Sequence, residues 1–217
     1  MMFIDDGPGP GAAQMAADEQ QWRRAERGDR ELRWRCYSFV PAVITVGAGE
    51  RAVPTDGVTR VRRPTGGRQL YHDRDFAYAV AGPHDHPLLA GAVADAYRRI
   101  GALWVRVLAE FGVAAELAAG RNYRHDCYCC ETLTDGDVMA AGRKLVAGAQ
   151  RRGRHGVMQH GSMALRPAYA AAAAALQCDA DLLRRRSVAL AEVAGREVSY
   201  SEVVAVWRDM LKAEEFT

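Results

Sequence analysis

About two thirds of the way along the chain, the sequence reads Gly142-Arg143-Lys144-Leu145-Val146-Ala147-Gly148-Ala149-Gln150-Arg151-Arg152. A lysine here stands between a glycine and an apolar strand. Of the 29 basic residues only two are lysines, Lys144 and Lys212. In a chain where nearly all basic positions are arginine, a lysine is a better candidate for a specific role, because lysine can release its proton and arginine does not. Lys212 stands near the end of the last predicted helix and is explained by the helix dipole.

Two interpretations of Lys144 remain open from the residues alone. A lysine beside apolar surface is desolvated, which suits acid–base work or the electrostatic holding of a carbonyl oxygen. The alternative is a lysine whose stem lies on the sheet while its ammonium stays in water.

Length and composition describe an ordinary globular chain. Its 217 residues predict a single domain spanning residues 1–217, and a net charge of +2 argues against binding to nucleic acid or membrane through bulk charge. No apolar stretch reaches about 18 residues, and the N-terminus carries acids where a signal peptide needs bases, so we expect a cytoplasmic protein. Five cysteines, an odd number, fit a reduced compartment better than a disulfide framework.

The periodicity of apolar residues predicts helices and strands spread along the whole chain. Residues 7–11, Gly-Pro-Gly-Pro-Gly, read as a turn segment without regular structure. The predicted helices span residues 12–27, 87–111 and 170–175, and a last helix begins at the capping box at 199–202. The predicted strands span residues 32–46 (broken at Pro41), 59–63, 69–80, 138–146 and 156–165. The last two strands flank a predicted turn at 151–154. Short βα alternations are few, so we expect an α+β fold with mainly antiparallel sheets flanked by helices.

Three further segments carry residues capable of chemistry. Gly66-Gly67 between two strands lets backbone approach a ligand, although a plain hairpin is the commoner meaning. His160, followed by glycine on a predicted strand, is more often structural than catalytic. The cluster from His125 to Cys130 is too cramped for tetrahedral zinc, which leaves a nucleophilic thiol or buried packing cysteines.

Taken in order, the motifs resemble the family of lipoate–protein ligases and octanoyl transferases, which share a catalytic fold with biotin–protein ligases. The resemblance covers nearly the whole chain and is carried by these segments: Phe3-Ile4-Asp5-Asp6-Gly7-Pro8, Met15-Ala16-Ala17-Asp18-Glu19, Arg62-Arg63-Pro64-Thr65-Gly66-Gly67-Arg68 with Tyr71-His72-Asp73, Gly142 to Gln150, and Gln159-His160-Gly161-Ser162. In this family the lysine of the glycine-flanked motif lies beside the acyl carbonyl, which favours a functional Lys144.

Within the family, the resemblance favours the cysteine-type transferase over the ATP-dependent ligase. Transferases read Gly-Gly-Arg in the first motif, as in Gly66-Gly67-Arg68, and carry a cysteine–aromatic pair fifteen residues before the motif lysine. That position is Cys129, because 144 − 15 = 129. The match is incomplete: Cys130 replaces the aromatic residue, and Leu133-Thr134 replaces the usual Pro-Ser. Cys127, followed by Tyr128, is the alternative nucleophile.

The resemblance therefore implies an acyltransferase. Cys129 would take an octanoyl or lipoyl group from acyl carrier protein as a thioester, and Lys144 would support the thiolate and the oxyanion. A lysine of a lipoyl domain or of the glycine-cleavage H protein would then receive the group as an amide. No metal or cofactor is expected, whereas the ligase alternative would need ATP and Mg. A non-catalytic relative that binds the acyl group or the carrier protein is the second alternative. The expected substrate-binding residues are Arg63, Gly66, Gly67, Arg68, Tyr71, His72, Ala147, Gly148 and His160.

Overall fold

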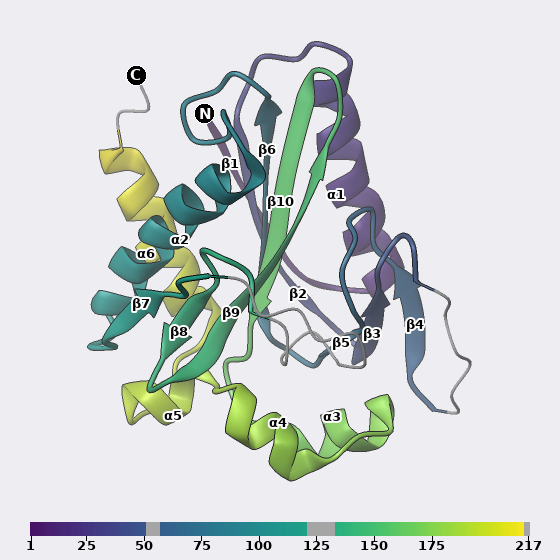
Figure 1. Ribbon diagram of the computed structural model, residues 1–217, viewed down its shortest axis with the longest axis vertical. Helices are drawn as coiled ribbons and strands as arrows, with labels where there is room; N and C mark the ends of the chain where they lie inside the picture. Colours follow the sequence, from purple (N-terminus) through teal and green to yellow (C-terminus); the bar gives the residue numbers. More distant parts are fainter. Residues whose placement is uncertain (51–56, 121–132, 215–217) are drawn as a thin grey trace.

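The computed structural model describes residues 1–50, 57–120 and 133–214 (Figure 1). Its centre is a sheet whose strand order is β1-β2-β6-β10-β9-β8-β7. Strands β1 and β2 run parallel, and the other neighbours among these described strands are antiparallel. The strands are β1 (Met2–Gly9), β2 (Arg33–Phe39), β6 (Phe76–Pro83), β7 (Ala115–Leu117), β8 (Val138–Ala140), β9 (Arg143–Arg152) and β10 (Gly156–Met163).

A smaller sheet stands beside the open lower end of the large one (Figure 1). It contains β3 (Val43–Val46) between β4 (Thr59–Arg62) and β5 (Leu70–His72). Strand β3 is parallel to β4 and antiparallel to β5. The predicted α+β class with mainly antiparallel sheets is confirmed.

Helices cover both faces of the large sheet, which explains why all seven residues of β2 are buried. Helix α1 (Gly11–Glu26) packs on β6 and β10, while α2 (Val93–Ala109) and α6 (Tyr200–Ala213) lie on the opposite face (Figure 1). Trp34, Trp104 and Trp207 form the centre of the core on the α2 and α6 side, with ring centroids 4.3 to 4.8 Å apart along Trp34–Trp207–Trp104. On the α1 side, Met15, Tyr37 and Phe39 belong to a smaller cluster.

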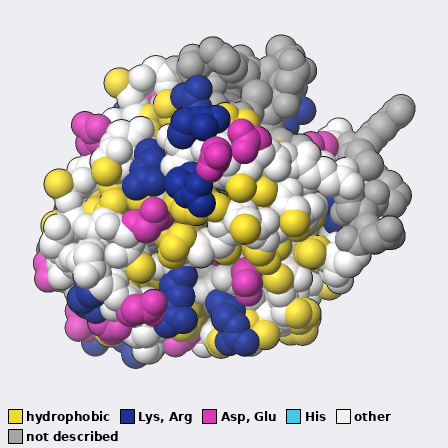
Figure 2. Space-filling view, turned by 90° about the horizontal axis from the view of Figure 1, so that it is seen from below, with side chains coloured by type: hydrophobic (Ala, Val, Ile, Leu, Met, Phe, Trp, Pro, Cys, Tyr) yellow, Lys and Arg dark blue, Asp and Glu magenta, His cyan; other side chains and the backbone are white. Residues whose placement is uncertain are grey.

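The lower end of the molecule is closed by three short helices: α3 (Tyr169–Leu176), α4 (Ala180–Arg186) and α5 (Leu190–Ala194). Seen from below, this face mixes apolar, basic and acidic side chains, and no histidine is visible among its described residues (Figure 2). Both histidines of the predicted site are buried, His72 at 5% exposure and His160 at 4%. No helix in the described ranges is long and apolar enough to cross a membrane.

Three predicted boundaries are wrong for local reasons. Residues 7–9 belong to β1, because the parallel pairing with β2 continues through the Gly-Pro sequence after a register shift between Asp5 and Gly7. Helix α2 begins at Val93 rather than at residue 87; buried Leu88 and Leu89 extend its apolar pattern from the preceding turn. The predicted strand over 69–80 is divided into β5 and β6 by Arg74, whose φ is 51°.

A fourth difference concerns the strand that carries the lysine. The segment 138–146 is a hairpin, because Ala141 and Gly142 adopt φ values of 48° and 69° between β8 and β9. Lys144 is therefore the second residue of β9, at the entry to the strand as predicted. Arg151 and Arg152 complete β9 and do not belong to the turn.

Candidate active site

Two adjoining cavities lie where the small sheet meets β9 and β10. The first, called the sheet cavity, holds about 370 Å3 of empty space, its open mouth included, and is lined by Met15, Tyr37, Phe39, Thr45, Arg63, Leu70, His72, Ala147, Gly148, Ala149, His160, Gly161 and Ser162. The second, called the lysine cavity, holds about 860 Å3 on the same measure and includes Lys144, Tyr71 and Asp75 in its wall. Leu70, Ala147 and Ser162 line both cavities, so the two are neighbours.

Small residues of β9 and β10 make the floor of the sheet cavity. Ala147 pairs with Ser162, Gly148 with Gly161, and Ala149 with His160 across the two strands. A Cβ on Gly161 would stand 2.1 Å from the carbonyl oxygen of Ala147, so no larger residue fits there without rearrangement. Met15, Tyr37 and Phe39 add apolar walls. The floor and these walls therefore offer apolar surface to a bound group, beside the polar side chains of Arg63, His72 and His160.

Lys144 is buried rather than hydrated. The residue is 5% exposed, and its Nζ lies 2.8 Å from Oδ2 of Asp137, whose side chain is 2% exposed. The same oxygen accepts a hydrogen bond from the backbone N–H of Thr134 at 2.8 Å. The interpretation with the ammonium in water is therefore wrong. A buried cation on a cavity wall can stabilise negative charge that develops on a substrate oxygen.

The loop between β4 and β5 is fixed from inside by Arg63. Its guanidinium donates to the carbonyl oxygens of Thr45 at 3.2 Å, Gly66 at 2.8 Å and Arg68 at 2.7 Å. A Cβ on Gly47 would stand 2.0 Å from the carbonyl oxygen of Gly67, so the loop rests directly on backbone. Because β4 and β5 lie on opposite sides of β3, the glycine pair does not belong to a plain hairpin.

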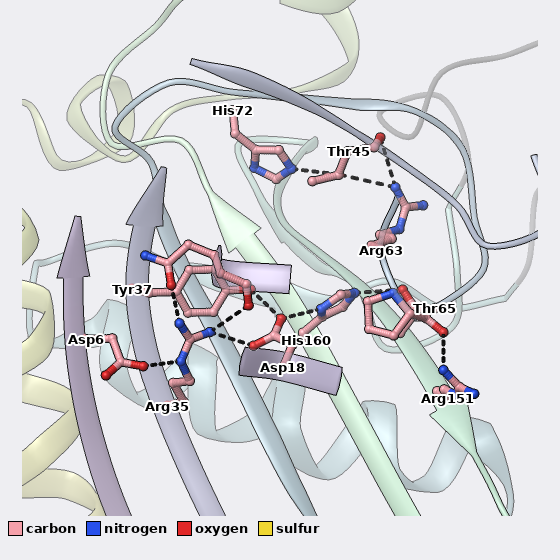
Figure 3. Close-up of polar contacts among 12 residues, drawn as sticks. Asp6, Asp18, Arg35, Tyr37, Thr45, Arg63, Thr65, His72, Arg151 and His160 are labelled. Atoms are coloured by element: carbon pink, nitrogen blue, oxygen red, sulfur yellow. Dashed lines mark hydrogen bonds and ion pairs between the residues drawn. The ribbon is translucent and has the colours of Figure 1, made fainter. Parts of the chain in front are cut away.

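A first chain of polar contacts joins Asp18, His160 and Thr65 (Figure 3). His160 Nδ1 lies 2.8 Å from Asp18 Oδ2, and His160 Nε2 lies 2.7 Å from Thr65 Oγ1. Since a carboxylate only accepts, Nδ1 carries the proton towards Asp18. His160 thus connects helix α1, strand β10 and the loop that follows β4.

Both oxygens of Asp18 have further partners. Arg35 Nη1 donates to Oδ1 at 2.7 Å, and the Tyr37 hydroxyl donates to Oδ2 at 2.7 Å (Figure 3). Arg35 also pairs with Asp6 and with the Gln14 side chain. Burial alone would lower the pKa of Arg35, but the charge of Asp18 raises this pKa overall. Burial, and to a smaller extent the charge of Asp18, raises the pKa of Tyr37 well above its ordinary value.

Asp18 and Arg35 were not predicted as site residues from the sequence. A signal for Asp18 was nevertheless present, because it occupies a buried position of α1 between Met15 and Trp22. A charged residue at a core position of an amphipathic helix needs a buried partner, and here that partner is Arg35.

A second chain joins Asp75, His72 and Thr45. His72 Nδ1 lies 2.6 Å from Asp75 Oδ2, and His72 Nε2 lies 2.9 Å from Thr45 Oγ1. Figure 3 shows Thr45 between His72 and Arg63. Asp75 is 5% exposed, yet its other oxygen, Oδ1, finds no hydrogen-bond partner in the described part of the chain. Asp75 and Asp137 were both missed from sequence, because each is recognised only through the residue it contacts in the fold.

The predicted site residues divide into four groups. Arg63, His72, Ala147, Gly148 and His160 line the sheet cavity, while Tyr71 and Lys144 line the lysine cavity, which also includes Ala147. Gly66, Gly67 and Arg68 line neither cavity and are joined to the site through Arg63. Cys129 and Cys127 lie outside the described residues.

No cluster of histidine, cysteine and acidic side chains suited to a metal ion occurs in the described ranges.

The chain belongs to the lipoyl protein ligase A/B catalytic domain family. The sequence pattern of this family matches residues 10–212. Among curated proteins it is 32% identical to octanoyltransferase LipM of Kyrpidia tusciae, over 93% of this chain and 82% of the relative. It is 31% identical to octanoyltransferase LipM of Moorella thermoacetica, over 90% of this chain and 79% of the relative.

Solved structures agree on the fold. Lipoate–protein ligase A bound with ATP superposes with a TM-score of 0.77 at 20% identity, covering 97% of this chain and 85% of the ligase. A putative lipoate protein ligase from T. acidophilum with bound lipoic acid gives a TM-score of 0.75 at 19% identity, covering 95% and 82%.

Proposed function

We propose that this protein is an octanoyltransferase of the cytoplasm, acting as a single catalytic domain. It takes an octanoyl or lipoyl group from the thioester of acyl carrier protein and delivers it to a lysine of a lipoyl domain or of the glycine-cleavage H protein. The named activity of the LipM relatives supports the octanoyl group. A structural neighbour from T. acidophilum, described with its E2 lipoyl domain, supports the kind of acceptor.

The observation that carries this proposal is the buried Lys144–Asp137 pair beside an apolar cavity floored by small residues. The acyl tail lies on the alanines and glycines of β9 and β10, and its carbonyl reaches Ala147 and Ser162, where the two cavities adjoin. There the Lys144 ammonium faces the carbonyl oxygen. Asp137 fixes its position, so the cation is in place before negative charge develops.

The reaction takes two transfers. In the first, the thiolate of Cys129, with Cys127 as the alternative, adds to the donor carbonyl; a C–S bond forms, and the carrier-protein thiolate leaves and takes up a proton. In the second, the acceptor amine adds to the enzyme thioester, the Cys129–carbonyl bond breaks, the departing thiolate takes up the proton that the nitrogen loses, and an amide remains. Lys144 stabilises the oxyanion of both steps. The scheme needs no cofactor.

Intact-protein mass spectrometry tests this scheme. After incubation with octanoyl-carrier protein, the wild-type protein is expected to gain one octanoyl group. The gain is expected to survive Cys127→Ala and to disappear in Cys129→Ala. An unmodified wild-type protein that transfers lipoate only with ATP and Mg would replace this proposal with the ligase. Affinity for a lipoyl domain without any transfer would select the non-catalytic alternative.

A further inference from the structure

The carboxylate of Asp75 is one of the buried polar groups that the proposed reaction has not used. Its side chain is 7% exposed, Oδ2 is bonded to His72, and Oδ1 is buried without a hydrogen-bond donor. An unsatisfied buried carboxylate oxygen is costly, because it has given up water and gained nothing in return. Such a group in a native fold needs an explanation, and a role in binding or catalysis is one that can be tested.

The position of Asp75 indicates what a binding partner would be. Asp75 lines the lysine cavity together with Lys144, and the ammonium of Lys144 is already paired with Asp137. Much of the remaining wall is apolar and includes Leu145, Ala164, Leu176 and Leu183. An incoming group with an apolar stem and a cationic end matches this wall: the stem packs on aliphatic side chains, and the charge reaches the carboxylate.

We infer that Asp75 binds the ammonium group of the acceptor lysine and takes its proton, an inference that rests on the proposed octanoyl transfer. The acyl group and the thioester carry no charge, so the acceptor lysine is the cation that the reaction brings to this wall. An ammonium entering an apolar cavity needs a counter-charge to offset its lost hydration. It must also lose a proton before its nitrogen can attack.

The proton balance follows from the same geometry. The acceptor ammonium gives one proton to Asp75 Oδ1, and its neutral nitrogen then bonds to the acyl carbon. The C–S bond breaks, and the second proton lost by that nitrogen goes to the departing thiolate, which becomes a thiol. His72 holds Asp75 through Oδ2 and is itself held by Thr45, so the carboxylate keeps its orientation. The proton on Asp75 leaves to solvent after the product dissociates.

The test separates charged from neutral acceptors. Wild-type and Asp75→Asn proteins are first loaded with octanoyl-carrier protein and then given either a lipoyl domain or hydroxylamine, which is neutral at pH 7. Asp75→Asn keeps an oxygen for His72 and is expected to load normally. It is expected to slow transfer to the lipoyl-domain lysine by about 100-fold or more, while hydroxylamine reacts within about threefold of the wild-type rate.

The matched comparison is Asp73→Asn. This change removes the same charge from an exposed side chain at the rim of the cavity, and it is expected to have a far smaller effect on transfer to the lysine.

Three outcomes would overturn the role of Asp75: equal slowing with both acceptors, no slowing with the lysine, or an effect of Asp73→Asn as large as that of Asp75→Asn. Failure of the proposed function has a different signature, because the wild-type protein itself would then fail to load from the carrier protein. If it used ATP instead, the same two acceptors would be compared on the adenylate, and the expected contrast for Asp75→Asn is unchanged.

Discussion

Two histidine chains reach the sheet cavity, one through His160 and the other through His72 and Thr45, and they differ in one respect. Asp18–His160–Thr65 is closed: Arg35, Tyr37 and His160 together occupy both oxygens of the carboxylate. Asp75–His72–Thr45 has the same order and similar distances, yet one carboxylate oxygen has no partner within the described ranges. The same three residue types can therefore stabilise the fold in one place, where every carboxylate oxygen is bonded, and leave a carboxylate oxygen for a substrate in another.

The surroundings of the two chains agree with this division. The closed chain joins α1 to β2 and β10, so its loss disturbs three elements of the α1 side of the core. The open chain ends in the wall of the lysine cavity, which Lys144 also lines. We therefore expect substitutions in the first to reduce stability and substitutions in the second to reduce turnover.

The largest expected effect is on stability, in Asp18→Asn. The change removes the buried carboxylate charge 2.7 Å from Arg35 and leaves Asp6, whose side chain is 43% exposed, as the remaining ion-pair partner of this guanidinium. Breaking a buried pair in this way costs about 3 kcal/mol or more. The matched Asp75→Asn variant is expected to lose less than about 1 kcal/mol, since it leaves no buried cation unpaired. Urea unfolding of both variants measures the contrast. Equal losses would contradict the division between a closed and an open chain.

The next effect is on turnover, in Lys144→Arg. Arginine keeps the charge but is longer and does not release a proton, so it cannot reproduce the ammonium position set by Asp137. We expect a loss of octanoyl transfer of at least about 100-fold, the usual scale for removing one group that stabilises an oxyanion. Steady-state transfer rates measure it, with Lys212→Arg as the matched control on an exposed helix end. If the Lys144→Arg variant kept more than roughly a tenth of wild-type activity, Lys144 would be removed from the chemistry.

A smaller effect is expected for Tyr37→Phe, which removes one donor from the closed chain. Asp18 Oδ2 keeps His160 as a partner, so the loss at pH 7 is about 1 kcal/mol. Octanoyl transfer should change little if the closed chain serves the fold. A large loss of turnover with unchanged urea unfolding would reverse the assignment.

The same tyrosine gives a comparable but more specific signal, in alkali. Its pKa in the folded protein is raised by burial and by Asp18, so the folded state holds a proton that the unfolded state releases above about pH 10. The stability from this group is complete below pH 10 and is lost as pH rises, by about 1.4 kcal/mol per pH unit. The free energy of unfolding measured from about pH 9 to about pH 11 should therefore fall less steeply in Tyr37→Phe than in wild type. Identical slopes would contradict a neutral, buried Tyr37.

The sequence was sufficient for the fold class and for the position of Lys144, because glycine turns and apolar periodicity are local signals. Strand β1 was missed, since its pairing partner β2 lies far along the chain and local Gly-Pro chemistry indicates a turn. The partners Asp137 and Asp75 were missed for a related reason. A carboxylate becomes informative only when the fold places it against a particular lysine or histidine, and no spacing in the chain encodes that contact.

The most direct measurement of the central claim is the mass of a lipoyl domain incubated with this protein and octanoyl-carrier protein in the absence of ATP. We predict that the domain gains one octanoyl group in an amide on its lysine, and that the gain is lost with Lys144→Arg. A domain modified only when free octanoate or lipoate and ATP are supplied would contradict it.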